Sequence, residues 1–380
     1  THLVGFEGGK AFPRGSLVAG PGGDILARAP LFEESVELVT VDLDEITRVR
    51  AQSPLLSDLE MRLPHLIDAL QQRRSPARTT VTDGVRQLVT MPAPVMPPQP
   101  SRLGAQAGED PLAIDPALTR RWLVEFIRDE VVRRRGFERA VVGISGGVDS
   151  ALVTMLAAEA LGPENVTAIR MPYRTSSPDS LAHAQEVIDR TGVRSETVDI
   201  SDGVDGLAAR LGDAPDPARL GNIMARMRMI TLFDRSAALR ALPLGTGNKT
   251  ERLFGYFTWH ADDSPPVNPI GDLFKTQLWA LAREVGVPED IVAKPASADL
   301  IAGQTDESDF GISYPRADLF LHWLLSGYAP AAIGALGFAA EEVGLVRHRL
   351  ESTHWTRRLP PVAMLSQTAI GEYYLRPVDY

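Results

Sequence analysis

The chain has 380 residues, of which 44% are hydrophobic and 23% are charged, so its composition is that of a globular protein with enough apolar side chains for a sizeable core. It has 39 basic and 49 acidic residues and a net charge of -10, which argues against a general nucleic-acid-binding surface. There is no cysteine, which excludes disulfides, thiolate metal sites and cysteine nucleophiles from this sequence, and no apolar stretch approaches the roughly 20 residues of a membrane span. We therefore expect a soluble cytoplasmic protein with no nucleic-acid or membrane partner.

The first part of the chain is expected to be modular, with residues 1–45 forming a small β segment. Apolar runs at 16–19 and 25–29 flank a Pro-Gly-Gly-Asp turn and predict a hairpin, and a third apolar run at 36–43 predicts another strand. Residues 46–75 have a helix-like pattern, whereas five prolines between positions 91 and 100 are incompatible with a helix or a central strand. We therefore interpret residues 46–113 as a helix followed by an extended linker from about residue 76.

After this linker the pattern changes to alternating helices and short apolar strands, and we assign residues 114–380 to one domain. Asp115 followed by Pro116 is a strong helix start. Such alternation predicts a doubly wound α/β fold, a parallel sheet with helices on both faces, in which ligands bind at the carboxyl ends of the strands. The predicted helices cover 116 to about 136, 150–161, 178–190 and 217–240, and the predicted strands cover 140–144, 166–170, 196–200 and 242–245.

A loop rich in glycine and serine lies between the first of these strands and the next helix. Its glycines allow a close approach of the backbone to a ligand, its serines add donors, and the following helix offers free N–H groups to an anion. Neither the lysine of the common nucleotide-binding loop nor the dinucleotide pattern G-x-G-x-x-G is present. We interpret it as a phosphate-binding loop, with a tight packing turn as the alternative. Its candidate ligands are Gly143, Ser145, Gly146, Gly147, Asp149 and Ser150.

The Ser-Gly-Gly-x-Asp-Ser stretch at 145–150 resembles the pyrophosphate-binding loop of the ATP pyrophosphatase superfamily, whose fold is adenine nucleotide alpha hydrolase-like. Guanylate, argininosuccinate and asparagine synthetases and the transfer-RNA-modifying ligases share this loop, so another amide ligase of this type stays open on the motif alone. Four further stretches, at 222–229, 244–258, 268–275 and 294–307, narrow the resemblance to NAD synthetases, and it covers roughly residues 112–380.

The resemblance implies that the chain converts nicotinate adenine dinucleotide (deamido-NAD) to NAD. In this family AMP is placed on the nicotinate carboxylate, pyrophosphate leaves, and ammonia attacks the acyl-adenylate. ATP is then the co-substrate and Mg²⁺ the cofactor. We expect a homodimer or a larger homo-oligomer.

Particular residues of this sequence match the family's site positions. Asp149 and Glu251 match the magnesium ligands, and carboxylate oxygens suit that hard ion. Lys275 matches a lysine that meets the ATP phosphates and completes the catalytic set; a solvated helix face is the alternative, although the chain has only four lysines. Thr246 and Ser297 match positions that contact ATP. The expected deamido-NAD contacts are Asn222, Arg226, Asp299 and His354.

Two positions depart from the family pattern. Trp259 and Thr356 stand where relatives usually have lysine, and the loss of two positive charges could weaken substrate binding unless other arginines substitute for them. Asp306 and Glu307 fall in a loop that closes over the substrates in the family, with an ordinary polar surface loop as the alternative.

Residues 1–45 resemble only the tail of the nitrilase-like amidase domain that releases ammonia from glutamine in glutamine-dependent NAD synthetases. That domain uses a Glu, Lys, Cys triad, whereas this sequence has no cysteine and begins, at Thr1, downstream of all three positions. We expect the chain to use free ammonia, with glutamine a donor only if a missing glutaminase part supplies it. The alternative to an enzyme is a non-catalytic assembly or regulatory subunit, which the presence of the full candidate set argues against.

Overall fold

The computed structural model divides the chain into two compact units, Thr1–Met96 and Pro97–Tyr380. Most of the predicted helix and linker at 46–113 lies outside the described residues, and the predicted domain limits stay predictions. None of the helices in the described part of the chain has the length and apolarity needed to cross a bilayer. The structure describes residues 4–7, 10–13, 16–20, 25–30, 38–40, 110–211, 214–297 and 305–357.

The first unit contains two antiparallel hairpins. Strands β3 (Leu17–Ala19) and β4 (Ile25–Arg28) form the hairpin that the sequence predicts, with an irregular register between Val18 and Ala19. Strands β1 (Val4–Glu7) and β2 (Lys10–Pro13) form a second hairpin that we had not predicted. The third predicted strand is wrong where it can be followed, because residues 38–40 belong to no strand; the rest of it lies outside the described residues.

The second unit is built on a parallel sheet, which confirms the predicted α/β class. The strands are hydrogen-bonded in the order β7-β6-β5-β8. The order changes direction at the central strand β5, because the chain moves from β5 through β6 to β7 on one side and then returns to place β8 on the other. The strands are β5 (Arg139–Gly143), β6 (Val166–Arg170), β7 (Arg194–Thr197) and β8 (Ala241–Leu244).

Strand β7 corrects the prediction of a strand at 196–200. The backbone N–H groups of Val198 and Ile200 still donate to the carbonyls of Arg170, the last residue of β6, and of Pro172 just after it, at 2.9 and 3.0 Å, but the ladder ends at Thr197. Ile200 instead precedes helix α7 (Ser201–Arg210), which we had not predicted, and is buried with Val204 of that helix. The residues predicted as one strand therefore divide between the sheet, up to Thr197, and the packing of α7, at Ile200.

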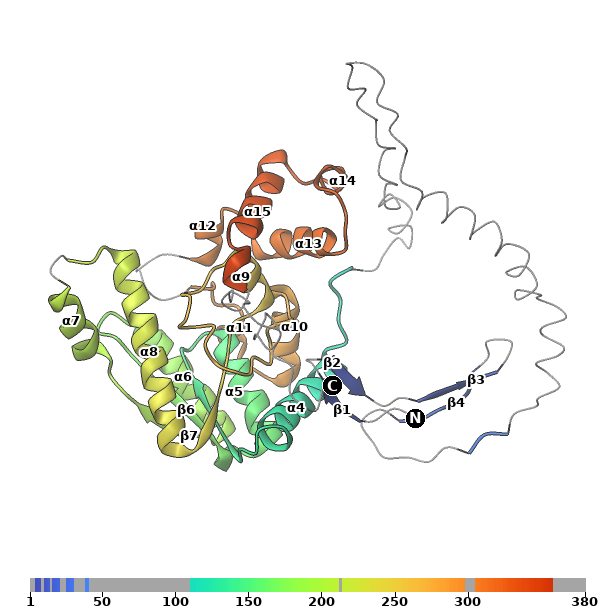
Figure 1. Cartoon of the computed structure of the whole chain (residues 1–380), viewed down its shortest axis with the longest axis horizontal. Helices are drawn as coiled ribbons and strands as arrows, with labels where there is room; N and C mark the ends of the chain where they lie inside the picture. The colour runs from blue at the N-terminus through green and yellow to red at the C-terminus, as the bar shows by residue number, and fades with distance from the viewer. Residues whose placement is uncertain are drawn as a thin grey trace, which may run out of the picture. The chain divides into compact units, whose positions relative to one another are not determined.

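Helices cover both faces of this sheet, as a doubly wound fold requires (Figure 1). Ala140 and Val142 of β5 pack with the helices of one face, whereas Val141 between them packs with Leu232 of α8 on the other, because successive strand residues point to opposite faces. The first face carries α4 (Pro116–Arg128), α5 (Val148–Leu161), α6 (Pro178–Thr191) and α10 (Lys275–Val285), and the second carries α8 (Pro217–Leu239) with α7.

Two predicted helix limits changed. The predicted helix at 116–136 is α4 followed by a π-helical turn at Asp129–Arg133, and the helix predicted from residue 150 already begins at Val148 as α5. Short helical segments also lie at Pro163–Asn165 and at α11 (Glu289–Val292).

A second hydrophobic core joins α9 (Lys249–Phe254) to the helices near the carboxyl-terminal end of the described chain, which are coloured orange to red in Figure 1. Its aromatic side chains meet edge to face, for example Phe254 and Phe310 at 4.9 Å between ring centroids, and Phe310 and Tyr314 at 5.2 Å. The later helices are α12 (Asp306–Phe310), α13 (Tyr314–Leu325), α14 (Pro330–Gly334) and α15 (Ala340–Ser352), followed by a 3-10 turn at His354–Arg357.

Candidate active site

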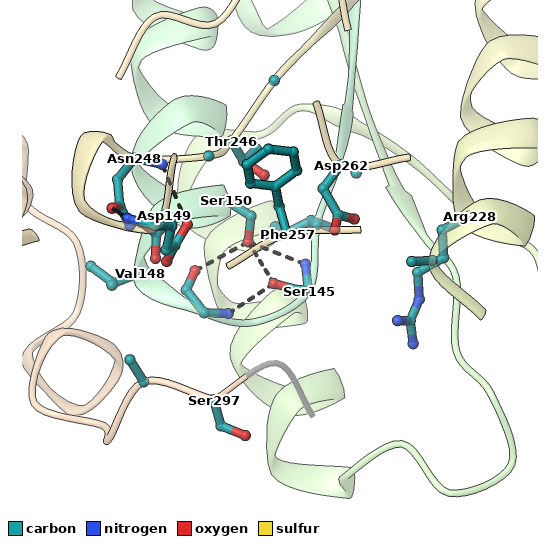
Figure 2. Close-up of a pocket in the computed structure, with 18 of the residues that line it drawn as sticks. Ser145, Val148, Asp149, Ser150, Arg228, Thr246, Asn248, Phe257, Asp262 and Ser297 are labelled. Carbon is teal, nitrogen blue, oxygen red and sulfur yellow. Dashed lines mark hydrogen bonds between the residues drawn. The ribbon is translucent and has the colours of Figure 1, made fainter. Parts of the chain in front are cut away.

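The glycine-rich loop after β5 is held by its own serines. The backbone N–H of Ser145 donates to Ser150 Oγ at 3.1 Å, Ser150 Oγ donates to the Gly147 carbonyl at 3.1 Å, and the Gly147 N–H donates to Ser145 Oγ at 3.3 Å (Figure 2). Gly147 is the N-cap of α5, so the free N–H groups of that helix open at the end of the loop. The sequence therefore builds a preformed cradle for an anion at the carboxyl end of β5.

Gly146 shows how closely this loop packs. Its φ is +82°, and a Cβ added there would lie 2.0 Å from the carbonyl oxygen of Ser180, at the start of α6. Only glycine satisfies both constraints, because other residues are strained at positive φ and have a Cβ. The loop is thus fixed against a neighbouring helix.

A buried lysine joins two carboxylates beside this loop. Lys275, the first residue of α10, is 1% exposed, and its Nζ lies 2.5 Å from Asp149 Oδ2 and 3.4 Å from Glu251 Oε1. Asp149 lies in the first turn of α5, just after the glycine-rich loop that follows β5, and Glu251 comes from α9, which follows β8. The sheet therefore brings the three predicted catalytic residues together where its strand order changes direction, the usual place for a ligand in such folds.

The Asn248 side chain links the Asp149 carboxylate to the start of α9. Its side-chain amide donates to Asp149 Oδ1 at 2.9 Å, and its side-chain oxygen accepts from the Glu251 N–H at 2.9 Å as the N-cap of α9 (Figure 2). Asn248 is fully buried. We had not predicted this role for Asn248, although an Asn three residues before a Glu is a helix-start signal.

Burial and mutual charge shift the pKa values of Lys275 and Glu251. Burial lowers the pKa of Lys275, but the carboxylates of Asp149 and Glu251 outweigh that effect and raise it above its ordinary value. Burial, opposed by the Lys275 charge, raises the pKa of Glu251 to about 8. The lysine is therefore held as an ammonium while Glu251 is poised to gain or lose a proton near neutral pH.

Asp306 adds a third carboxylate to the wall of the same cavity. It is 4% exposed, its Oδ2 accepts from the Tyr314 hydroxyl at 2.8 Å, and burial raises its pKa. Its Oδ1 is buried without a hydrogen-bond partner among the described residues. The alternative of an ordinary polar surface loop is therefore wrong for Asp306. Glu307 accepts a hydrogen bond from the Tyr314 N–H at 2.8 Å.

The cavity at this end of the sheet has a volume of about 480 Å³. Gly146 packs against α6, whereas the other predicted ATP-binding residues line the cavity. Lys294, which we had not predicted, also lines it, and its Nζ donates to Ser180 Oγ at 3.1 Å. Lys294 could have been predicted from the sequence, because the chain has only four lysines. The predicted lining residues are Gly143, Ser145, Gly147, Asp149, Ser150, Thr246, Lys275 and Ser297.

Two of the predicted deamido-NAD ligands, Asn222 and Arg226, contact the loop at Thr258 and Trp259 beside the cavity. Asn222 Oδ1 accepts from Thr258 Oγ1 at 2.9 Å, and Arg226 donates to the Trp259 carbonyl at 3.2 Å. Thr258 lines the cavity, whereas Asn222, Arg226 and His354 do not.

His354 Nδ1 lies 2.7 Å from the Glu351 carbonyl oxygen, within hydrogen-bond distance. The ring of the adjacent Trp355 meets the Trp259 ring edge to face, with 5.0 Å between the ring centroids. Trp259 and the segment that follows His354 are therefore neighbours in the fold. Asp299 lies outside the described residues. The substrate contacts of all these residues stay predictions.

Comparison with known proteins agrees with this geometry. A family model described as NAD synthase matches residues 120–360. The chain belongs to the NAD synthase family. It is 49% identical over 270 residues to an NH3-dependent NAD+ synthetase of Trichlorobacter lovleyi, an alignment covering 71% of this chain and 98% of that protein. It is 46% identical over 263 residues to the protein of the same name from Chlorobaculum parvum, covering 68% and 94%.

Solved structures of NAD synthase relatives share the fold. An NH3-dependent NAD synthetase from Campylobacter jejuni superposes with a TM-score of 0.57 at 27% identity, covering 66% of this chain and all of that one. An NMN synthetase from Francisella tularensis superposes with a TM-score of 0.59 at 26% identity, covering 66% and 99%. These likenesses support the adenine nucleotide alpha hydrolase-like fold expected from the sequence.

Proposed function

We propose that this chain is an ammonia-dependent NAD synthetase that amidates deamido-NAD at the expense of ATP. The observation that carries the proposal is the buried Lys275 ammonium between Asp149 and Glu251, beside the anion cradle at 143–150. The activity named for relatives up to 49% identical, whose own length the chain covers almost completely, supports it. No protein nucleophile is required, which suits a chain without cysteine.

The chain's own residues would act by position and charge. Backbone N–H groups at the start of α5 and the Ser145 and Ser150 hydroxyls hold the ATP phosphates. The Lys275 ammonium neutralises the negative charge that grows as pyrophosphate leaves the α-phosphorus, and burial strengthens this effect because little water screens it. Since the site is built before the substrates arrive, little reorganisation is required at the moment of reaction.

The donor set fits a magnesium ion. Asp149 and Glu251 offer carboxylate oxygens from the first turns of α5 and α9, and both residues line the cavity. Mg²⁺ commonly takes only one or two protein carboxylates and completes its shell with phosphates and water. When bound, it would supply Lewis-acid neutralisation of the phosphate charge. Asp149 and Glu251 would hold it, with Lys275 as their counter-ion in its absence.

The test is an assay of the purified chain with ATP, Mg²⁺, deamido-NAD and ammonium. We expect NAD, AMP and pyrophosphate in equal amounts, because pyrophosphate leaves when the carboxylate is adenylated and AMP leaves when ammonia displaces it. Formation of ADP and phosphate would contradict the proposal. A second assay replaces deamido-NAD with nicotinate mononucleotide. Amidation of this smaller substrate would indicate the activity of an NMN synthetase, the name given to the Francisella tularensis neighbour.

A further inference from the structure

The carboxylate of Asp318 is buried behind the group formed by Lys275, Asp149 and Glu251, which we call the Lys275 centre. It is fully buried on α13 and does not line the cavity, so the substrates do not touch it in this arrangement. It accepts three hydrogen bonds: from Thr250 Oγ1 at 2.5 Å, from the Thr276 N–H at 2.9 Å and from Thr276 Oγ1 at 2.8 Å. Each of its partners is adjacent in sequence to a residue of the centre.

The two threonines belong to different helices. Thr250 precedes Glu251 at the start of α9, and Thr276 follows Lys275 at the start of α10. Thr250 Oγ1 also accepts from the Lys275 N–H at 3.1 Å. One carboxylate therefore sets the relative position of two helix starts, one bearing the ammonium and the other a carboxylate that faces it.

Helix α13 supports Lys275 at a second point. Tyr314 lies four residues before Asp318, so the two side chains share one face of the helix. The Tyr314 ring lies 5.4 Å from Lys275 Nζ, and its hydroxyl donates to Asp306. Helix α13 thus holds the residue after Lys275 through Asp318 and contacts the Lys275 ammonium through Tyr314.

A carboxylate is an unfavourable choice for a purely space-filling position, because a buried charge loses its hydration and an apolar side chain would pack as well. Its advantage is that it can accept several hydrogen bonds at once and so orient several donors. Here it orients the donors that flank Lys275 and Glu251.

We propose that Asp318 is a positioning residue, which fixes α9 and α10 so that the Lys275 ammonium reaches the phosphates opposite Asp149 and Glu251. This inference rests on the proposed function. It predicts that the effect of Asp318 on turnover passes through Lys275 and disappears when that lysine is removed.

The experiment is a double-mutant cycle with Asp318→Ala, Lys275→Ala and both together, assayed for NAD formation at a temperature where all variants are folded. We expect Asp318→Ala to lower kcat about 10- to 100-fold with little change in the KM for ammonium, and to add less than about threefold to the loss in Lys275→Ala. Asp129→Ala is the matched control, because Asp129 is also a buried carboxylate, held by Arg134 at 2.7 Å, but lies outside the cavity lining. It should lower the Tm without lowering kcat.

Two further variants make the test independent of the folding of Asp318→Ala. Asp318→Asn keeps the shape and one acceptor oxygen, and should stay within about fivefold of wild-type kcat. Thr250→Val removes the shared hydroxyl and should show the same coupling to Lys275→Ala as Asp318→Ala does. Fully additive losses in both cycles, or equal kcat in Asp318→Ala and Asp129→Ala, would overturn the inference. Inactivity of the wild-type chain would instead overturn the proposed function.

Discussion

Lys275 Nζ lies 2.5 Å from Asp149 Oδ2, although the two residues are 126 positions apart in the chain. The contact joins the start of α5 to the start of α10, and the same ammonium reaches Glu251 on α9. One cation therefore balances two carboxylates from separate elements, and the cluster carries an excess of negative charge whenever both are ionised. That excess suits a divalent cation and makes each carboxylate sensitive to substitution.

Removing either carboxylate charge should stop turnover without unfolding the protein. Asp149→Asn and Glu251→Gln keep the side-chain shape, but each removes a magnesium ligand, and we expect kcat to fall about 100- to 1000-fold. The measurements are steady-state NAD formation and circular dichroism. Glu159→Gln, on the surface pair with Arg120, is the control and should behave as wild type. Wild-type activity in both site variants would refute the assignment.

Protonation of Glu251 should make stability depend on pH. Its pKa is about 8 in the folded protein against an ordinary 4.5, so between these values the folded state holds a proton that the unfolded chain has released. Stability therefore falls as pH rises from about 4.5 to about 8 and levels off above that. We expect the Tm of the wild type, without ATP and magnesium, to decline more steeply over this window than that of Glu251→Gln. Parallel curves would mean that Glu251 is already ionised on folding.

The packing of Gly146 gives a prediction with an internal control. Gly192 ends α6 with a similar φ of +69° but has nothing within 4 Å of an added Cβ. Gly192→Ala should cost about 1 kcal/mol from backbone strain alone. Gly146→Ala adds a collision with the Ser180 carbonyl, so we expect a larger loss of stability and weaker ATP binding. Thermal unfolding and ATP titration measure both; equal effects would show that the loop relaxes freely.

The nitrogen donor should be ammonia. A glutaminase of the amidase type forms a thioester on cysteine, and this chain has none. Glutamine freed of ammonia should therefore give no NAD, whereas ammonium should, and at fixed total ammonium the rate should increase as pH rises toward the ammonium pKa because only neutral ammonia is a nucleophile. Sustained synthesis from glutamine with stoichiometric glutamate release would contradict this.

The sequence predicted the sheet and the anion loop because both depend on local patterns. Apolar runs punctuated by glycine and proline marked strands β5, β6 and β8, and the loop motif lies within eight residues. Strand β7 ended earlier than predicted because Ile200 belongs to the packing of α7, a tertiary fact that periodicity does not contain.

Residues that act through distant partners could not be found in this way. Asp318 lies on a helix where an aspartate would ordinarily face water, and its partners Thr250 and Thr276 are 68 and 42 positions away. Asn248 reaches Asp149 across 99 positions. These contacts form only where the core of the parallel sheet meets the core of the later helices, which local sequence patterns do not contain.

These long separations also determine when the site can form during synthesis. The chain emerges from the ribosome with its N-terminus first. The glycine-rich loop at 143–150 therefore appears well before Glu251 and Lys275, and Asp318 follows later. A nascent chain that ends before α13 would have the anion cradle and both carboxylates, but not the carboxylate that joins α9 to α10. If Asp318 positions α9 and α10 as proposed, we expect the centre to reach its final geometry only after α13 has been made.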